Sequence, residues 1–317
     1  MGGDSSAEAE DLPRVTVFGP HPILGITIER RGADEDDIHV HPGGQGVWVA
    51  RMAGEMAAYP VLCGFCGGET GMLLRPLLDE LPGERRLVET IFASGSWVID
   101  RRSGEREMIA HAWSDPPTRH EVDDLFSVTT ASALTSRVLV VCGPVPQDSL
   151  PIEIYERLVK DVRVHGTKVV VDLSPPRLDS ALEGGPDVVK ADEWQLAQLI
   201  GEDTREPEEF RRAAELVIER GAGAVVATRG ADPVLVLTKD GHAWELVPPV
   251  FAEGAAEGSG DSMVGALAAA LARGMALEDA LRLGAAAGAT NFLRHGLGTG
   301  SRAVVEDLVQ RVELRPL

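Results

Sequence analysis

The chain has 317 residues, 44% of them hydrophobic, which is enough for one large domain or two smaller ones with a full core. Fifty acidic residues against thirty basic ones give a formal net charge of −20, which argues against binding nucleic acid or an anionic membrane surface. No apolar run reaches the roughly eighteen residues of a membrane span, and no basic segment followed by an apolar one opens the chain, so we expect a cytoplasmic protein.

The first half of the chain mixes strand and helix patterns with two charged hairpins. Residues 1–12 are polar and acidic, which predicts a disordered tail before one folded domain spanning 13–317. Segments at about 24–42 and 95–112 alternate polar and apolar residues and predict the strands of a small β lid. The other elements expected here are a strand at 14–19 and helices at 45–56 and 69–81.

The second half alternates strands and helices more regularly. Residues 136–143 and 167–174 are nearly continuous β-branched runs, which are typical of a sheet buried on both faces. Between them, 150–165 is expected to form a helix with Ser149 as its cap. Further strands are expected at 186–190 and 223–230, and further helices at 192–200, 206–220 and 263–271. This alternation predicts an α/β fold with a mostly parallel central sheet between helical layers, and a ligand site beyond the carboxyl ends of the strands.

Three cysteines occur in the chain. Cys63 and Cys66 form a C-x-x-C pair, which matches half of a zinc motif or a redox motif, and Cys142 stands alone. No second pair completes a zinc site, and Cys63 ends an apolar strand-like run. We therefore expect buried core thiols.

Two glycine-rich loops each open a helix. The first is HPGGQGVWVARMAG, and the second is EGSGDSMVGALAAAL from residue 257 to 271. In the second loop, Ser259 and Asp261 could simply cap a core helix. Alternatively, bare glycine amides at the helix start could form an anion site with an acid beside it. Neither loop is a Walker loop or a complete G-x-G-x-x-G, and this disfavours a dinucleotide-dependent oxidoreductase as an alternative α/β enzyme.

The two loops in this order carry a resemblance to a known family. GGQGVWVAR, GFCGGETG and GSGDSMVGALAAAL resemble the GGKGxNVAR, GFLGGxTG and GAGDSMVAG motifs of ribokinase-like (phosphofructokinase-B type) carbohydrate kinases, in the 1-phosphofructokinase and tagatose-6-phosphate kinase branch. TVFGPHPILGITI is similar to the TLNPAxDxTI opening of that branch, and the likeness covers about residues 14–314. The resemblance implies a ribokinase-like three-layer α/β/α sandwich with a small β lid, through which we expect a homodimer.

The resemblance also implies an activity. Members move the γ-phosphoryl group of ATP to a hydroxyl of a sugar or sugar-like substrate, with Mg²⁺ as cofactor. The turn amides of Gly258, Ser259 and Gly260 would form an anion hole, and Asp261 would take the hydroxyl proton. This agrees with the physics of phosphoryl transfer, in which preorganised amides stabilise charge on the transferred oxygens. The alternative is a catalytically weak member of the family that senses or regulates by binding a small ligand.

Further residues are implied on the nucleotide side. Asp192 falls where the family has the Asn of its magnesium motif, and it would hold Mg²⁺ through water, while Gln195 falls on the motif's Glu. Glu257, just before the glycine turn, is an acid where anionic phosphates should bind, and we expect it to repel ATP. The nucleotide-binding residues that the resemblance implies are Lys190, Asp192, Gln195, Thr228, Gly230 and Asn291.

The departures from the family concentrate on the acceptor side. The family's sugar-hydroxyl Asp falls on Gly25, the GGKG lysine on Gln45, the following Asn on Trp48, and the phosphate-binding Arg near Gly95. These neutral, small or aromatic residues predict an acceptor that is not phosphorylated and is flatter than a hexose phosphate, unless lid arginines such as Arg101 or Arg106 replace the missing charge. Histidines 21, 39 and 41 are expected at the surface or on the lid. The implied substrate-binding residues are Gly25, Gly43, Gly44, Gln45, Trp48 and Trp97.

Overall fold

The computed structural model describes residues 12–317 except 33, 252–253, 255 and 294–297. The tail predicted at 1–12 therefore lies almost wholly outside the described residues. The main feature is a ten-stranded sheet, in which seven neighbouring strands from β11 to β5 run parallel. In spatial order its strands are β14 (Glu313–Pro316), β13 (Ala243–Val247), β12 (Val234–Thr238), β11 (Ala224–Thr228), β10 (Val188–Asp192), β9 (Lys168–Asp172), β8 (Val138–Cys142), β1 (Arg14–Phe18), β4 (Tyr59–Gly67) and β5 (Glu84–Thr90).

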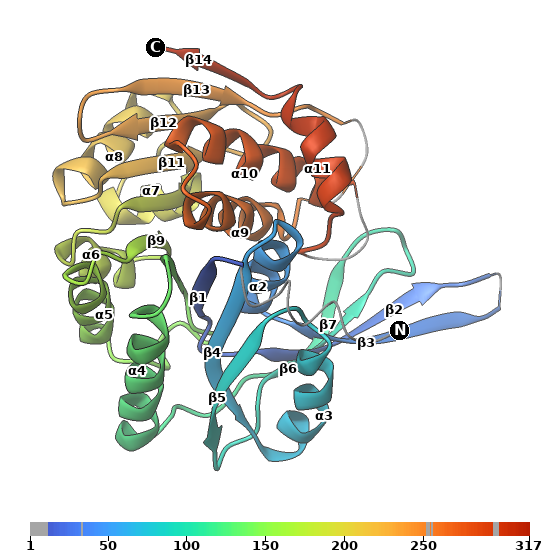
Figure 1. Ribbon diagram of the computed structural model, residues 1–317. Coiled ribbons are helices and arrows are strands. Elements are labelled where there is room, and N and C mark those ends of the chain that lie inside the picture. The colour runs from blue at the N-terminus through green and yellow to red at the C-terminus, as the bar shows by residue number, and fades with distance from the viewer. Residues whose placement is uncertain (1–11, 33, 252–253, 255, 294–297) are drawn as a thin grey trace.

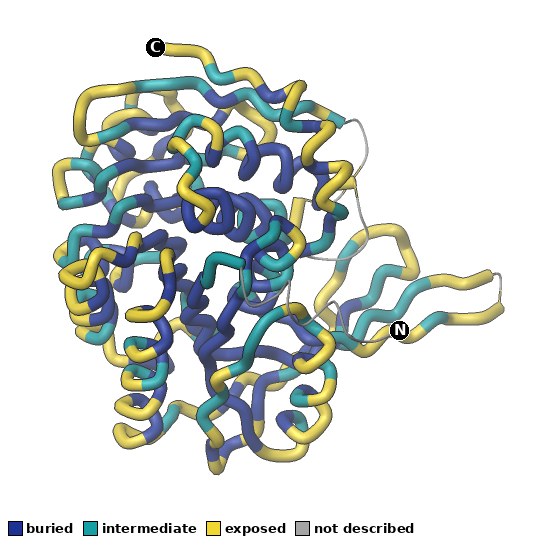
Figure 2. The backbone as a smooth tube through the Cα atoms, viewed as in Figure 1, coloured by how far each residue is buried: buried dark blue, intermediate teal, exposed yellow. Residues whose placement is uncertain are grey.

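Helices cover both faces of this sheet, as the β-branched runs predicted (Figure 1). Each face of the sheet packs side chains into a separate buried cluster, so the central strands from β12 to β4 are buried on both faces, whereas the outer strands β14, β13 and β5 are only partly buried (Figure 2). One face carries α2 (Gln45–Glu55), α9 (Ser259–Ala272) and α10 (Leu277–Phe292), with α11 (Arg302–Val309) against α10. The other carries α4 (Arg119–Ala133), α5 (Glu153–Arg163), α6 (Arg177–Glu183), α7 (Glu193–Ile200) and α8 (Pro207–Glu219). The three-layer α/β/α sandwich is confirmed.

A second sheet of four strands stands at the side of the sandwich. Its order is β3 (Asp36–Gly43), β2 (Ile23–Arg30), β6 (Ser96–Asp100) and β7 (Glu107–Ala112), and α3 (Gly68–Asp79) lies beside it. The β2–β3 hairpin extends away from the body (Figure 1). These strands coincide to within one residue with the two segments where the sequence predicted lid strands, and we call them the small sheet.

Helix α9 is buried along nearly its whole length and lies directly on α2. A Cβ atom on Gly265 of α9 would sit 2.6 Å from the carbonyl oxygen of Val49 in α2, so only glycine allows this approach. The contact brings the first turns of the two helices, which carry the two glycine-rich loops, to the same place. One predicted boundary is wrong: α5 begins at Glu153 after Ile152, and the Ser149 hydroxyl donates to the Pro146 carbonyl (2.8 Å) instead of capping the helix.

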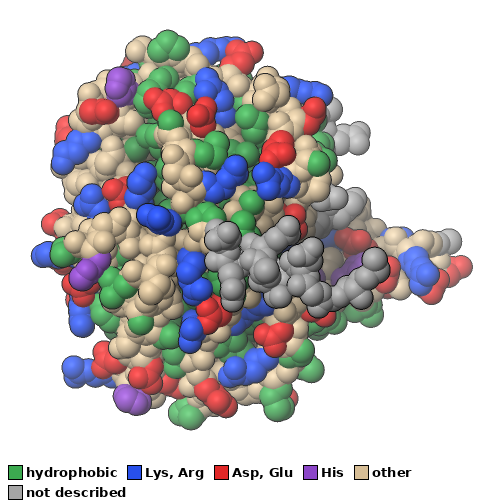
Figure 3. All heavy atoms as spheres, viewed as in Figure 1, with side chains coloured by type: hydrophobic (Ala, Val, Ile, Leu, Met, Phe, Trp, Pro, Cys, Tyr) green, Lys and Arg blue, Asp and Glu red, His purple; other side chains and the backbone are tan. Residues whose placement is uncertain are grey.

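The cysteines behave as the sequence predicted. Cys63, Cys66 and Cys142 are buried and none forms a disulfide. Burial raises the pKa of Cys63 to about 11, so this thiol stays protonated and unreactive at neutral pH. Among the helices of the described residues, none is long and apolar enough to cross a membrane. On the face drawn in Figure 3, basic and acidic side chains are interleaved.

Candidate active site

The residues singled out from the sequence gather at the carboxyl edge of the parallel strands. Asp172 ends β9, Asp192 ends β10 and Thr228 ends β11, and the register pairs Asp192 with Thr228. Helices α2 and α9 begin at the same edge. The site therefore forms where open α/β sheets bind ligands.

At the centre of this edge lies a buried charged network. Lys190 Nζ is 3.4 Å from Asp172 Oδ2 and 4.0 Å from Asp192 Oδ2, and Gln195 Nε2 donates to Asp172 Oδ1 (3.1 Å). Burial lowers the pKa of Lys190, but the charges of Asp172, Asp192 and Asp261 together raise it, so the lysine is held as an ammonium. A Cβ atom on Gly260 would lie 3.2 Å from Nζ, which places the ammonium directly beside the glycine turn.

Asp172 is a residue of the site to which the sequence motifs assigned no role. It is 3% exposed and joins Lys190 to Gln195, although no motif singled it out. A signal existed, because an acid that ends a continuous apolar strand of a parallel sheet must lie at the ligand edge. Buried charges require partners, so Asp172 also explains how Lys190 can be buried at this position.

Asp192 and Gln195 form a reciprocal cap at the start of α7. The Asp192 carboxylate accepts a hydrogen bond from the backbone N–H of Gln195 (2.8 Å), and the backbone N–H of Asp192 donates to Gln195 Oε1 (2.7 Å). The cap fixes Gln195 so that its Nε2 reaches Asp172. The Asp192 side chain remains 46% exposed and open to a ligand. Gln195 thus contributes a hydrogen-bonded link within the network, where a glutamate would add another negative charge.

The second glycine-rich loop does not cap its helix with a side chain. Gly258 is the N-cap of α9, with φ of 77° in the left-handed region that favours glycine, and neither Ser259 nor Asp261 caps the helix. Of the amides expected to face an anion, that of Ser259 instead donates to the Ala256 carbonyl (3.1 Å). The remaining first-turn amides have no intrahelical acceptor, and the positive end of the α9 dipole is left without a carboxylate cap.

Asp261 lies on the first turn of α9 and is half-buried. Burial, reinforced by the charge of Asp172, raises the pKa of Asp261 to about 7, while Lys190 and a hydrogen bond from Gln45 act in the opposite direction. A carboxyl group with a pKa near neutrality can accept a proton from a substrate and return it to solvent.

Gln45, the first residue of α2, connects Asp261 to the strand ends. Its Oε1 accepts from the Gly143 amide (2.9 Å), and its Nε2 lies 3.4 Å from the Asp172 carbonyl oxygen. The oxygen and nitrogen of this amide are therefore oriented by two backbone groups of neighbouring loops. The orientation leaves Nε2 as the donor toward Asp261.

Asn291, near the end of α10, holds the glycine turn from behind. The side chain is 1% exposed; its Nδ2 donates to the Glu257 carbonyl (2.8 Å), and its Oδ1 accepts from the Gly298 amide (2.9 Å). Asn291 thus contacts the turn backbone, and its role toward the nucleotide stays a prediction. Burial lowers the pKa of the half-buried Arg106, and the charge of the exposed Glu257 partly opposes that shift.

Beyond the network lies a cavity of about 430 Å³ between α9, α10 and β11. Lys190, Asp192, Thr228 and Gly230 line its polar end, so four of the six residues assigned to the nucleotide come together there. The rest of the lining is mostly apolar. Among the described residues, no group of three His, Cys, Asp or Glu side chains is placed to hold a metal ion.

On the opposite side, α2 meets the small sheet. Trp48 of α2 and Trp97 of β6 have ring centroids 6.0 Å apart, and Gly25 and Gly43 lie against Trp97. Two of the three histidines are placed as expected, since His39 and His41 belong to β3. His21 is neither exposed nor on the small sheet: it is 6% exposed, it contacts Phe65, and burial lowers its pKa to about 4.

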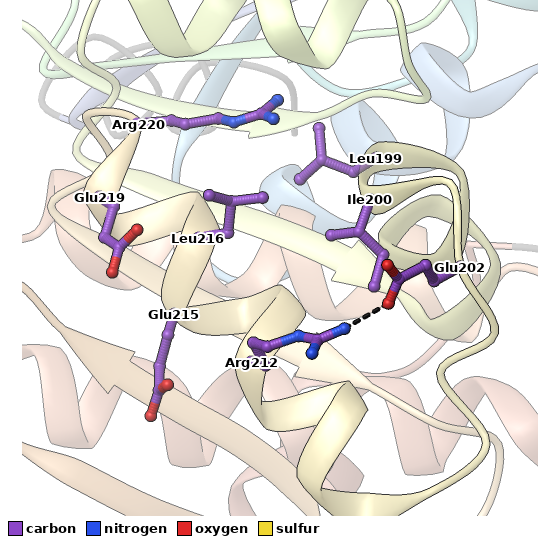
Figure 4. A pocket seen from close by; sticks show the side chains of 8 residues that line it. All are labelled: Leu199, Ile200, Glu202, Arg212, Glu215, Leu216, Glu219 and Arg220. Atoms are coloured by element: carbon purple, nitrogen blue, oxygen red, sulfur yellow. Dashed lines mark hydrogen bonds and ion pairs between the residues drawn. The ribbon is translucent and has the colours of Figure 1, made fainter.

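A separate hollow between α7 and α8 lies away from these residues. Leu199, Ile200 and Leu216 point into it, and an ion pair between Arg212 and Glu202 closes one end (Figure 4). None of the site residues predicted from the sequence lines it. The chemistry-bearing groups are therefore concentrated at the strand edge.

The fold and the strand-edge site define an α/β enzyme of the ribokinase-like class. The sequence model of the pfkB family of carbohydrate kinases matches residues 23–303, so the chain belongs to that family. The chain is 26% identical to 1-phosphofructokinase of Bacillus subtilis over 279 residues, covering 87% of this chain and 89% of the relative. The resemblance stated from the motifs is confirmed, and the protein is a carbohydrate kinase.

Solved structures agree with this assignment. Phosphofructokinase-2 from Escherichia coli, in complex with potassium, superposes with a TM-score of 0.82 at 24% identity, covering 95% of this chain and 99% of that one. Ribokinase from Arabidopsis thaliana, complexed with ribose and ATP, gives a TM-score of 0.68 at 18% identity, covering 94% of this chain and 99% of that one. Both likenesses establish the ribokinase-like fold.

Proposed function

We propose that the protein transfers the γ-phosphoryl group of ATP to a hydroxyl of an unphosphorylated, sugar-like acceptor, with Asp261 as general base. The observation that carries this proposal is a carboxyl group with a pKa of about 7, one residue from an uncapped glycine turn and near the Lys190 ammonium. A base and an anion site side by side are what phosphoryl transfer to an alcohol requires.

The bond changes follow from this arrangement. The acceptor hydroxyl gives its proton to the Asp261 carboxylate as its oxygen bonds to the γ-phosphorus. The bond from that phosphorus to the bridging oxygen breaks, and ADP leaves. Charge on the transferred oxygens meets the α9 N-terminus at Gly258 and Gly260 and the ammonium of Lys190. The Ser259 backbone amide is not free to bind the phosphoryl group, because it already donates to the Ala256 carbonyl, so Ser259 acts only as part of the turn.

The nucleotide fits the cavity beyond Lys190. A mostly apolar lining suits a base, and Thr228 and Gly230 adjoin it on the β11 side. The half-exposed carboxylate of Asp192 suits Mg²⁺ held through water, because Mg²⁺ keeps several waters and needs few protein ligands. Bound Mg²⁺ would neutralise charge on the phosphate oxygens.

We also propose a homodimer formed through the small sheet. Cross-strand register puts Val40, Ile26 and Val98 in one row, and Ile38 and Ile28 in the next, on one face. Ile38 is 63% exposed and Val40 50% exposed. An apolar face of this kind supports pairing with a second copy. Light scattering coupled to size exclusion tests this, and Val40→Lys should give a monomer.

The test of the proposed activity is ADP release with ATP and Mg²⁺ across a panel of free sugars, sugar phosphates and nucleosides. Asp261→Asn should lower turnover with any accepted substrate about a hundredfold or more, because a general base typically contributes that much. ATP affinity should change little. Equal turnover in the variant and the parent would remove Asp261 from the mechanism.

A further inference from the structure

The site-facing side of the small sheet carries an unusual row of side chains. The register aligns His41 of β3, Gly25 of β2, Trp97 of β6 and His111 of β7 directly across the four strands. This is the side that packs on the sandwich, because Trp97 lies against Trp48 of α2. The acceptor side of the site is therefore bounded by aromatic rings.

Two glycines make room for the central ring of this row. A Cβ atom on Gly25 would come within 2.9 Å of the Trp97 Nε1 and 2.5 Å of the His41 Cε1, and a Cβ on Gly43 within 2.9 Å of the Trp97 Cζ2. Any side chain at Gly25 would displace the indole. The position of Trp97 therefore depends on glycine at both 25 and 43, and an acidic side chain at position 25 would collide with the indole.

The rings continue on both sides of Trp97. Trp48 is half-buried at 6.0 Å with planes 36° apart, and Trp113, which is 37% exposed, meets Trp97 edge-on at 6.4 Å. His111 lies over Trp113 with centroids 4.6 Å apart. Beneath them, Ile23 and Val145 complete an apolar cluster. Trp48 and Trp113 are thus partly exposed around the buried Trp97, and aromatic faces of this kind favour a flat, uncharged ligand.

This surface also holds an unused hydrogen-bond donor. The indole Nε1 of Trp97 is buried, has no partner among the described residues, and belongs to a side chain that is only 7% exposed. Buried indole N–H groups usually find an acceptor. An acceptor atom on the edge of a ligand ring would supply it. The neighbouring His41 is not available in the same way, because its Nε2 pairs with Thr27 Oγ1 at 2.9 Å.

The aromatic surface lies about one helical turn along α2 from Gln45, whose side chain acts on the reacting carboxyl group. Gln45, which hydrogen-bonds to Asp261, and Trp48 are three residues apart on α2 and so lie on the same side of the helix. A substrate whose hydroxyl reaches Asp261 therefore extends its body along Trp48 toward Trp97.

We propose that the acceptor alcohol carries an uncharged planar ring with a hydrogen-bond acceptor on its edge, and that Trp48, Trp97 and Trp113 bind this ring. The proposal rests on the phosphotransfer proposed above and names the substrate class for the same site. A hexose phosphate matches these side chains less well, since it has no aromatic ring to stack on the indoles. Burial lowers the pKa of His41, and the charges of Arg51 and Arg106 lower it further.

The experiment compares matched acceptors that differ only in the ring. Uridine is paired with methyl β-D-ribofuranoside, and phenyl β-D-glucopyranoside with methyl β-D-glucopyranoside; fructose 6-phosphate is the phosphorylated comparison. Both ADP release and equilibrium binding are measured on the full chain. In at least one pair, the ring-bearing compound should bind about tenfold or more tightly, the order expected when an aromatic side chain stacks on a base.

Variants then assign the preference to the tryptophans. Trp48→Leu should reduce the ring preference toward unity, mainly through KM, whereas Trp48→Phe should retain most of it. Trp194→Leu is the matched control, because Trp194 is 55% exposed on α7 and takes no part in the cluster. If no ring-bearing compound binds more tightly than its methyl partner, the ring proposal is wrong. If fructose 6-phosphate is preferred and Arg106→Gln abolishes that preference, it is also wrong, but phosphotransfer through Asp261 stands.

Discussion

The ammonium of Lys190 lies 3.4 Å from the carboxylate of Asp172, and both side chains are almost completely buried. Neither charge could be buried alone at an acceptable free-energy cost. The pair places one positive and one negative charge near Asp261, where they act in opposite directions on its pKa. Burial is the main cause of the raised pKa of Asp261, and these two charges on β9 and β10 adjust it.

The first prediction concerns Asp172→Asn. Removing this negative charge should lower the pKa of Asp261, because the charge of Asp172 disfavours a second carboxylate. Since Asp261 must be deprotonated to act as a base, the acidic limb of the kcat/KM profile should move to lower pH. Asp179→Asn, at a surface ion pair with Arg220, is the control and should leave the profile in place. An acidic limb that moves to higher pH would contradict the argument.

Gln45→Leu should produce the opposite shift. The hydrogen bond from Gln45 lowers the pKa of Asp261, so its loss should raise that pKa and move the acidic limb to higher pH. The same variant frees the Gly143 amide, which should also lower thermal stability slightly. The pH profile of kcat/KM, measured beside that of Asp172→Asn, distinguishes the two effects. Shifts of the same sign in both variants would rule out this account of the site.

Asp261 should also link stability to pH. Its pKa of about 7 in the folded state exceeds its usual value of 3.8, so between these values the folded chain binds more protons than the unfolded chain. Stability must then fall as pH rises through this window. Asp261→Asn removes the free-energy cost of ionising this buried carboxyl group. The Tm of the variant should therefore exceed that of the parent protein by more at pH 8 than at pH 5. Each kcal/mol corresponds to about 2–4 °C in a large domain. Differential scanning calorimetry at the two pH values measures the difference.

The sequence predicts the layers of this fold well because the pattern is local. The β-branched runs of β8 and β9 and the small residues of α9 have few alternatives to a buried strand and a buried helix. The cap at Ser149 was wrong because the chain turns once more before α5, and its hydroxyl satisfies the Pro146 carbonyl inside that turn. Such competition between local hydrogen bonds leaves no trace in periodicity.

The sequence indicated several residues of the candidate site, but it did not show which of them contact one another. Motifs pointed to Asp261, Lys190 and Asp192, yet Asp172, which pairs with Lys190 and contributes to the raised pKa of Asp261, carries no motif and comes from another strand. The motifs also did not show that the side-chain amide of Asn291 bonds to the Glu257 carbonyl and the Gly298 backbone amide. These roles depend on contacts between segments that are far apart in sequence. One amino-acid sequence by itself does not reveal such contacts.

Glu257→Thr tests the expectation that an acid beside the turn repels ATP. The structure also places the positive charge of Arg106, in the β6–β7 hairpin, where it interacts electrostatically with Glu257. Glu257 is exposed, so its effect on ATP should be weak, about two- to fivefold tighter binding on removal, and smaller at high salt. Arg106→Gln should weaken ATP binding by a similar factor. Titrations of both variants at two salt concentrations decide the point, and weaker ATP binding by Glu257→Thr would show that the acid contributes favourably.

The last prediction concerns the support of the glycine turn by Asn291. Asn291→Ala removes a buried donor to the Glu257 carbonyl and a buried acceptor for the Gly298 amide. Leaving buried polar groups unpaired costs about 1–3 kcal/mol each, so the free energy of unfolding should fall by a few kcal/mol. Turnover should fall further than stability explains at temperatures where the variant is fully folded, because the turn beside Asp261 loses its fixed position. Thr290→Ala, one residue earlier, is the control, since its hydroxyl donates only to the Ala286 carbonyl within α10. Thermal melts together with kcat at 15 °C separate the two contributions, and an Asn291→Ala enzyme with parental kcat would show that the turn keeps its geometry without this amide.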